Sequence, residues 1–183
     1  MPTEKTKLSI VGARLVSYPR FCDDRGYFQP LDIEVLNSIV DEIKLPRRSF
    51  ISKSKKKVLR GLHYQKENSL ANLVTVLVGE IFDVGVDLRR KSKTFLHVNH
   101  LRIDQNSPYG VYWPPGVAHG FLALGETNLL HYSCFGEYCK KLEGGLHFLD
   151  KTLNIPWPNS PLIVNDRDAH FRDLSAFIDE DFC

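Results

Sequence analysis

Two histidines in this chain stand where a histidine can take up and release a proton beside a binding site. His63 follows Arg60 by three residues in the segment 58–65, Val-Leu-Arg-Gly-Leu-His-Tyr-Gln, and His119 ends the segment 114–119, Pro-Pro-Gly-Val-Ala-His. Histidine titrates closer to neutral pH than any other unperturbed side chain. We expect each to end a strand at a glycine-containing turn, where the mouth of a β-barrel places its binding groups. Four other histidines alternate with apolar residues, which favours surface or structural roles: His97, His100, His131 and His147.

The spacing Pro-x-Gly-x-x-His at residues 114–119 is that of the second cupin motif, which supplies a ligand histidine in metal-binding cupins. The first cupin motif needs His-x-His, and this chain has His63, Tyr64 and Gln65 instead. A neutral amide is a weak metal ligand, so the pattern favours the fold and disfavours the metal. The four cysteines form no Cys-x-x-Cys pair that would indicate zinc. We therefore expect no metal and no other cofactor.

Length and composition indicate one globular domain. The chain has 183 residues, 43% of them hydrophobic and 25% charged, with a formal net charge of +2. That charge is too small to indicate a nucleic-acid or membrane partner. The polar N-terminus and the lack of an apolar run near 18 residues predict a cytoplasmic protein. We expect a single domain over residues 1–183, with an N-terminal arm over about 1–20 and a C-terminal tail over about 160–183.

The elements that must position the two histidines are mostly strands. Residues 31–45 have the best helical spacing, and Pro46 blocks its continuation. A further short helix is expected in the tail from Asp173. Apolar or alternating segments separated by turn residues recur about every ten residues, at 73–78, 81–88, 95–103, 111–113, 121–124 and 129–134. This spacing is typical of antiparallel sandwiches and barrels. The expected fold is all-β, a cupin or jelly-roll β-sandwich with short peripheral helices.

Several segments in a fixed order carry a resemblance to a known family. They are residues 58–65, Gly-Glu-Ile-Phe-Asp-Val-Gly-Val-Asp-Leu-Arg at 79–89, residues 114–121, Tyr132, Tyr138, Asp-Asp-Arg-Gly-Tyr-Phe at 23–28 and Asn-Asp-Arg-Asp at 165–168. Over about residues 10–170 the chain resembles the dTDP-4-dehydrorhamnose 3,5-epimerases. The resemblance implies a cupin-type β-sandwich, a homodimer with an exchanged N-terminal strand, and no metal requirement.

The resemblance also implies the chemistry, which belongs to deoxysugar and cell-surface polysaccharide biosynthesis. The substrate would be a nucleotide-diphosphate 4-keto-6-deoxy sugar, most simply dTDP-linked, whose ketone acidifies the C–H bonds at C3 and C5. Inversion needs a base on one face, a proton donor on the other and a group that stabilises the enolate. By resemblance, His63 is the base, Asp168 fixes its ring and stabilises its charged form, and Tyr132 returns the proton from the opposite face.

The remaining residues of the implied site would bind the substrate. Arg60 has the guanidinium fork that suits a phosphate. Arg25 and Phe28 would contact the nucleotide across the dimer. His119 would line the pocket or hydrogen-bond the substrate, and Tyr138 would help position the sugar. Further substrate contacts are expected from Gln65, Asn72 and Arg167.

The chain departs from the family pattern at the enolate and nucleotide ends. Asn72 stands where the family usually has a lysine that neutralises the enolate oxygen, and Lys57 or Lys66 could replace that charge. Losing an oxyanion donor typically costs about 100- to 1000-fold in rate. At the nucleotide end, Pro30 replaces a common glutamate, and Arg48 and Phe50 replace a glutamine and an asparagine: three changes that leave the base and the exact sugar open.

Four functions follow from these residues. The first is the 3,5-epimerase. The second is a relative that inverts one centre, C3 or C5, or moves the ketone as a 3,4-ketoisomerase; the donor Tyr132 argues for epimerisation. The third is a non-catalytic cupin that binds a sugar nucleotide, which Asn72 favours and the set His63, Asp168 and Tyr132 opposes. The fourth is a metal-dependent cupin, against which Gln65 argues.

Overall fold

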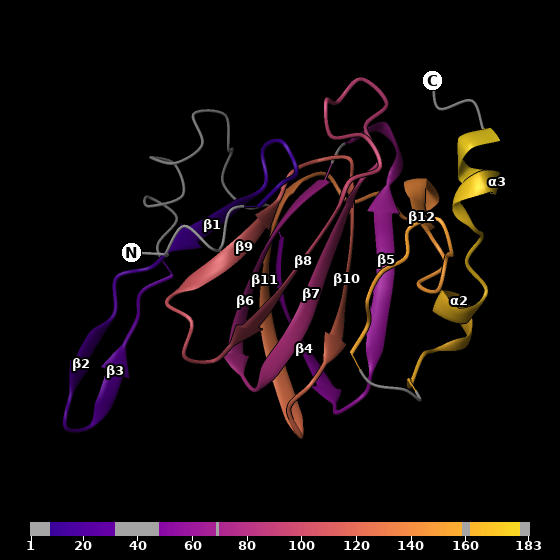
Figure 1. The fold of residues 1–183 in the computed structure, drawn as a ribbon. Coiled ribbons are helices and arrows are strands. Elements are labelled where there is room, and N and C mark those ends of the chain that lie inside the picture. Colours follow the sequence, from indigo (N-terminus) through magenta and orange to yellow (C-terminus); the bar gives the residue numbers. More distant parts are fainter. Residues whose placement is uncertain (1–7, 32–47, 69, 159–161, 180–183) are drawn as a thin grey trace.

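The computed structural model describes residues 8–31, 48–68, 70–158 and 162–179, which form two antiparallel five-stranded sheets packed face to face (Figure 1). Sheet 1 has the strand order β1 (Arg14–Ser17), β9 (Tyr109–Trp113), β6 (Leu70–Val78), β11 (Thr127–Gly136) and β4 (Arg48–Lys55). Sheet 2 has the order β12 (Glu143–Gly145), β5 (Leu59–Gln65), β10 (Val117–Ala123), β7 (Glu80–Asp87) and β8 (Val98–Asp104). This is the all-β sandwich predicted from the sequence.

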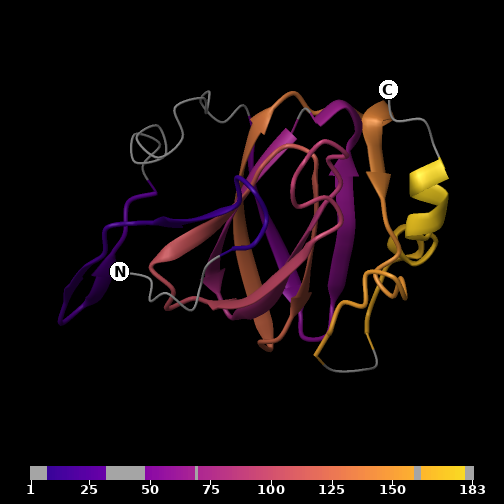
Figure 2. The ribbon, with the colours of Figure 1, turned by 45° about the horizontal axis from the view of Figure 1, so that its top comes forward.

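Short elements surround the two sheets. A hairpin of β2 (Phe21–Asp23) and β3 (Gly26–Phe28) extends away from the body of the molecule in both ribbon views (Figures 1 and 2). The helices α2 (Asp166–Ala169) and α3 (Leu174–Asp179) lie outside sheet 2. Two 3-10 turns, η2 (Lys66–Asn68) and η3 (Lys140–Leu142), complete the described elements.

The main core fills the space between the sheets. Trp113 and Val111 of sheet 1 pack with Phe121, Val117 and Ile81 of sheet 2, and each of these side chains is buried. Along β8, Leu101 and Ile103 contribute to this core while Arg102 between them is exposed, as expected for a strand with one face on a core. Burial of these apolar side chains is the main driving force that holds the two sheets together.

A second core covers the outer face of sheet 2. Leu59, Leu62 and Phe82 pack there against Leu174 and Phe177 of the C-terminal segment. Because sheet 2 is covered on both faces, all seven residues of β10 are buried, as are most of β7. The sequences of these two strands are therefore nearly continuous apolar runs. The C-terminal segment is thus part of the fold that positions the site, and two isolated bridges, 58 with 163 and 146 with 172, fix its course.

The predicted strands correspond to observed ones, with shifted ends. The segment predicted at 95–103 begins as a strand only at Val98, because residues 90–95 form turns. The segment predicted at 121–124 begins earlier, at Val117, and the short helix expected after Asp173 is α3. The helix expected over residues 31–45 falls outside the described residues, apart from residue 31.

The prediction that His63 and His119 end their strands is wrong. His63 lies within β5 and His119 within β10, and the two are register partners. β5 continues to Gln65 because Glu143–Gly145 pairs with its last three residues, and β10 begins at Val117 because that residue pairs with Asp87. The two histidines therefore stand side by side on sheet 2 instead of on separate turns.

No helix in the described ranges is long and apolar enough to cross a membrane. The single-domain organisation and the cytoplasmic location stay predictions.

Gly61 allows β5 and β10 to approach closely beside His63. Its φ is +120°, and a Cβ added there would lie 2.5 Å from the Cα of Gly120 and 2.9 Å from the His119 carbonyl oxygen. Both atoms belong to the backbone and cannot move aside as a flexible side chain would. Gly26, at the hairpin turn, has a similar φ of +125° but no atom within 4 Å of the added Cβ.

We therefore predict that Gly61→Ala lowers the free energy of unfolding by clearly more than Gly26→Ala does. Gly26→Ala adds only backbone strain, worth about 1–3 kcal/mol, whereas Gly61→Ala adds a collision with the neighbouring strand. Urea unfolding of both variants and the unsubstituted protein measures the difference. Equal losses would contradict the packing role given to Gly61.

Candidate active site

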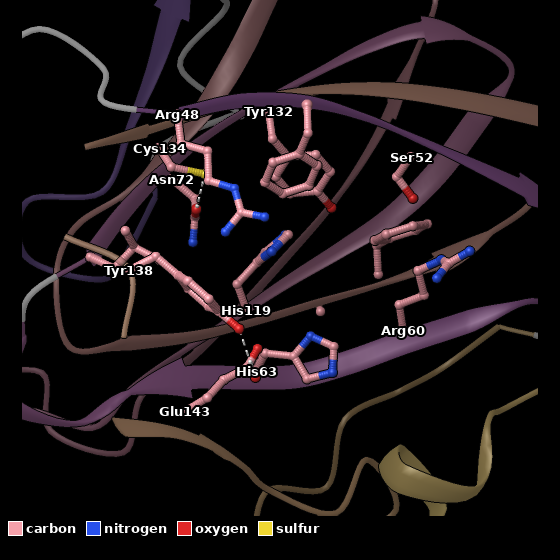
Figure 3. A pocket seen from close by; sticks show the side chains of 14 residues that line it. Arg48, Ser52, Arg60, His63, Asn72, His119, Tyr132, Cys134, Tyr138 and Glu143 are labelled. Carbon is pink, nitrogen blue, oxygen red and sulfur yellow. Dashed lines mark hydrogen bonds between the residues drawn. The ribbon is translucent and has the colours of Figure 1, made fainter. Parts of the chain in front are cut away.

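A pocket of about 330 Å³ opens between the two sheets, and strands of both contribute to its walls (Figure 3). Sheet 2 supplies His63 and His119, and sheet 1 supplies Asn72 and Tyr132. Alternate residues of a strand point to the same face. The pocket therefore presents two histidines from one side and a phenol and an amide from the other.

His63 is held by Asp168, which reaches it from α2. The Nε2 atom of His63 lies 2.9 Å from the Oδ1 atom of Asp168, and the other carboxylate oxygen accepts a hydrogen bond from the backbone N–H of Gly61 at 2.9 Å. Asp168 is 1% exposed, while the His63 side chain is 39% exposed. With Asp168 ionised, Nε2 carries the proton, so the Nδ1 lone pair faces the pocket (Figure 3). That is the arrangement of a base with a fixed tautomer.

The carboxylate of Asp168 stays ionised in spite of its burial. Desolvation raises the pKa of Asp168, but hydrogen bonds from His63 and Gly61 and the nearby positive charges outweigh it, so the pKa lies below the usual range. Local sequence explains its position, since Asn165 caps α2 by accepting a hydrogen bond from the Asp168 N–H at 2.7 Å. The ionised partner can balance a positive charge on His63.

His119 forms a second pair, deeper in the fold, with Asp83. Its Nε2 atom lies 2.6 Å from Asp83 Oδ1, and the indole N–H of Trp113 donates to Asp83 Oδ2 at 2.9 Å. Trp113 covers Gly85, where any Cβ would collide with the indole ring. All three polar partners are buried. This network fixes the His119 ring at the back of the pocket. The His119 side chain is nearly inaccessible to solvent.

Tyr132 faces His63 from sheet 1. Its ring stacks on Phe50 with a centroid distance of 4.8 Å and an interplanar angle of 10°. Burial raises the pKa of the Tyr132 phenol well above its usual value, and the negative charge of Asp83 adds to the rise. The phenol therefore remains protonated at neutral pH and can act as a donor.

The ends of the pocket carry one arginine each (Figure 3). Arg60 donates through Nε to the Ser54 hydroxyl at 3.1 Å and also reaches the Lys53 carbonyl at 3.3 Å. Arg48, at the other end, lies with its guanidinium carbon 4.7 Å from the ring centroid of Tyr138. Two cations about a cavity of this size suit an anionic ligand.

Tyr138 and Glu143 close the pocket on the Arg48 side. The Tyr138 hydroxyl donates to Glu143 Oε2 at 3.3 Å, and Arg167 forms an ion pair with the same oxygen at 3.0 Å. Tyr138 and Glu143 line the pocket, whereas Arg167 supports it from outside.

Gln65 also lies outside the lining. Its amide donates to the Glu137 carbonyl at 2.7 Å and accepts from the Cys139 N–H at 2.8 Å. These two bonds fix the backbone on both sides of Tyr138. The position of Gln65 indicates a residue that positions Tyr138, whereas the sequence suggested a direct substrate contact.

Arg25 and Phe28 lie on the projecting hairpin, away from the pocket of their own chain (Figure 1). Arg25 pairs with Asp23 of the same hairpin, and Phe28 is 68% exposed. The structure therefore brings His63, His119, Tyr132, Asn72, Tyr138 and Arg60 together at the pocket, with Asp168 directly behind His63. It does not bring Arg25 or Phe28 there.

Sequence reasoning did not assign several residues to this site. Asp83 and Glu143 were not singled out, although Asp83 stands among apolar residues of a predicted strand, where a buried carboxylate needs a partner. Arg48, Phe50 and Ser52 show the period of two that places residues on one face of a strand. Of these three, Arg48 and Phe50 stand out in the sequence only as departures from the family pattern. Neither Lys57 nor Lys66 lines the pocket.

The arrangement can move protons on both sides of a bound molecule. A histidine backed by a carboxylate stands on sheet 2, and a protonated phenol stands opposite on sheet 1. Among the described residues, no three histidine, cysteine, aspartate or glutamate side chains gather as a metal site would require. Both pocket histidines direct Nε2 to a carboxylate.

The family model described as dTDP-4-dehydrorhamnose 3,5-epimerase matches residues 7–176. An epimerase of that description from Methanothermobacter thermautotrophicus is 34% identical over 175 residues, 92% of each chain. A dTDP-4-dehydrorhamnose 3-epimerase from Streptomyces niveus is 34% identical and covers 88% of this chain and 79% of its own.

A solved structure gives the same likeness. The dTDP-6-deoxy-D-glucose-3,5-epimerase of Legionella pneumophila, in complex with dTDP-4-keto-L-rhamnose, has a TM-score of 0.86 and 30% identity and covers 92% of this chain and 93% of its own.

The ionised state of Asp168 leads to a prediction about stability and pH. Because its folded-state pKa is lowered, its charge stabilises the fold above the unfolded-state value near about 3.9, and this contribution is lost as pH falls through the lower folded-state value. We expect Asp168→Asn to lower the free energy of unfolding at pH 7 by about 1–3 kcal/mol. The difference from the unsubstituted protein should shrink as pH falls below about 4.

Denaturant unfolding between pH 7 and pH 3 measures this difference. Asp24→Asn, at an exposed position of the hairpin turn, serves as the control and should change stability little at any pH. A loss in Asp168→Asn that stays constant down to pH 3 would show that the charge is not what stabilises this part of the fold.

Proposed function

This chain belongs to the dTDP-4-dehydrorhamnose 3,5-epimerase family, whose members are isomerases acting on carbohydrates, and on that premise we propose that it inverts both C3 and C5 of a dTDP-linked 4-keto-6-deoxy sugar. The observation that carries the proposal is the placement of a carboxylate-backed base and a protonated phenol on opposite sheets of one pocket. A sugar ring between them would meet a proton acceptor on one face and a proton donor on the other.

The first step falls to His63. Its Nδ1 takes the proton from C3 or C5, and the electrons of the C–H bond move into the enolate, which places negative charge on the ketone oxygen. Asp168 keeps the proton on Nε2 and then balances the imidazolium that forms. Asp168 is thus a positioning residue that also stabilises charge, and it does not itself take the proton.

The second step falls to Tyr132. Its raised pKa keeps the phenol protonated until the enolate carbon accepts the proton, and solvent or a neighbouring group restores the phenol afterwards. Stacking on Phe50 holds the ring in one plane, so the direction of donation is fixed. Inversion follows because the proton leaves from the His63 face and returns from the Tyr132 face.

Binding is shared among groups around the pocket. Arg60 can bind a phosphate of the diphosphate while its Nε stays bonded to Ser54, and His119 and Tyr138 would contact the sugar. Arg25 and Phe28 would contact the nucleotide in the pocket of a partner subunit, because their hairpin points away from their own pocket. The protein would then act as a homodimer.

A single-centre epimerase is the second candidate. The close stacking of Phe50 on Tyr132 restricts how far the phenol can follow a turning sugar, and a relative of similar identity is named a 3-epimerase. A fixed donor that reaches C3 but not C5 would invert one carbon only.

Solvent exchange separates these functions. The protein is incubated with dTDP-4-keto-6-deoxyglucose in deuterated water, and C3 and C5 are read by NMR. We expect deuterium at both carbons with inverted configuration; deuterium at one carbon would support the second candidate, and at neither would contradict both.

Variants of the two acid–base residues test their roles in the same assay. His63→Ala should slow exchange roughly 100- to 10,000-fold, as expected for removing a general base. Tyr132→Phe should retain exchange but lose inversion, because the proton can then return only from the His63 face. His97→Ala, at an exposed histidine outside the pocket, should behave as the unsubstituted protein. Full exchange in His63→Ala would rule out this assignment of the base.

Coexpression tests the shared site. A mixed dimer of one His63→Ala chain and one Arg25→Ala/Phe28→Ala chain would hold one doubly altered site and one intact site, provided that the hairpin serves the partner's pocket. We expect activity well above that of either variant alone. If the hairpin served its own chain, every site would carry a defect and no activity would return.

A further inference from the structure

Proton abstraction in this pocket places negative charge on the ketone oxygen, and that charge needs a donor already in place. Preorganised donors at a developing oxyanion are usually the largest single contribution to catalysis. Asn72 lies in the pocket but is neutral, and neither Lys57 nor Lys66 lines the cavity. Arg48 and Arg60 are the pocket-lining arginines, and Arg60 is already bonded to Ser54 and to the Lys53 carbonyl.

Arg48 and Asn72 stand in one row across sheet 1. Cys134 of β11 is the register partner of Arg48 in β4 and of Asn72 in β6, and all three line the pocket. A row of register partners presents its side chains to the same face of a sheet. Figure 3 shows the Arg48 guanidinium extending into the cavity between Asn72 and His119.

The contacts of the Arg48 guanidinium with the described residues are aromatic. Its guanidinium lies 4.7 Å from the ring centroid of Tyr138 and 5.7 Å from that of Phe50, so two aromatic faces hold it in place. Glu143 is the acidic side chain that lines the pocket near Arg48, and within the described ranges its ion pair is with Arg167. Cation–π contacts therefore position the Arg48 guanidinium, while Glu143 pairs with Arg167.

The orientation of the Asn72 amide is also fixed. The Cys134 thiol lies 3.2 Å from Asn72 Oδ1 and donates to it, which turns the Nδ2 donors toward the cavity beside Arg48 (Figure 3). Burial raises the pKa of the Cys134 thiol to about 11, so it stays a donor at neutral pH. A cation and an oriented amide therefore face the same space.

We propose that Arg48, assisted by the Asn72 amide, binds the ketone oxygen of the substrate and stabilises the enolate that forms when His63 removes the proton. The inference rests on the proposed function, and it assigns the electrophilic role within that reaction to a pair of residues on sheet 1. Arg60 is left to the diphosphate at the other end of the pocket.

Arg48→Gln tests the inference with dTDP-4-keto-6-deoxyglucose as substrate. We expect kcat for solvent exchange to fall about 100- to 1000-fold, as for loss of an oxyanion donor, with KM changed much less. Arg102→Gln removes an exposed arginine of β8 outside the pocket and should leave both constants unchanged.

Two rescue experiments separate this role from a structural one. Adding Asn72→Lys to Arg48→Gln returns a cation to the neighbouring position in the row and should recover most of the lost kcat. Millimolar guanidinium chloride should raise kcat of Arg48→Ala but not that of His63→Ala. A variant damaged only in folding would respond to neither, and thermal unfolding identifies such damage independently.

Different outcomes refute the proposed function and the role of Arg48. An unsubstituted protein that exchanges neither C3 nor C5 would refute the proposed function and this inference with it. An active protein whose Arg48→Gln variant keeps its kcat, or shows only a raised KM, would refute the inference alone, because Arg48 would then be unused or would bind the diphosphate. A fall in kcat with neither rescue would also refute it.

Discussion

The hydrogen bond between His63 and Asp168 joins positions 105 residues apart, and much of the fold serves to make it. Asp168 arrives on a four-residue helix whose place depends on the Asn165 cap and on the apolar side chains that attach the C-terminal segment to sheet 2. The same carboxylate accepts from the Gly61 N–H, so it also fixes the strand that carries its partner. A charged group can be buried here because each of its oxygens has a donor.

The chemistry is divided between the two sheets. Sheet 2 carries His63 and His119, each held through Nε2 by a carboxylate. Sheet 1 carries the residues that face them: the phenol of Tyr132, the amide of Asn72 and the guanidinium of Arg48. Because the two walls belong to one sandwich, the core that packs them together also sets the distance between the proposed acid, Tyr132, and the proposed base, His63. Packing and the proposed chemistry are thus coupled through the same strands.

The sequence was sufficient to predict the sandwich, most strands and the pocket residues that fall in recognisable motifs. It could not show that His63 and His119 are register partners, because strand pairing depends on contacts distant in sequence, such as Glu143–Gly145 with β5. Nor could it show that Gln65 supports a loop while Arg48 enters the pocket. Both depend on which way a side chain turns after the strands have paired, and residue type alone does not determine that.

The packing of Trp113 over Gly85 limits which substitutions this site can accept during evolution. Any side chain at Gly85 would displace the indole, and loss of the indole would remove one of the donors to Asp83, the partner of His119. A lineage could alter this wall only by simultaneous substitutions, which are rare. Arg48 and Phe50 reach the opposite wall from β4, the edge strand of sheet 1 among the described residues, where Phe50 is 41% exposed. Divergence in substrate preference should therefore accumulate on that edge, with the histidine wall inherited nearly unchanged.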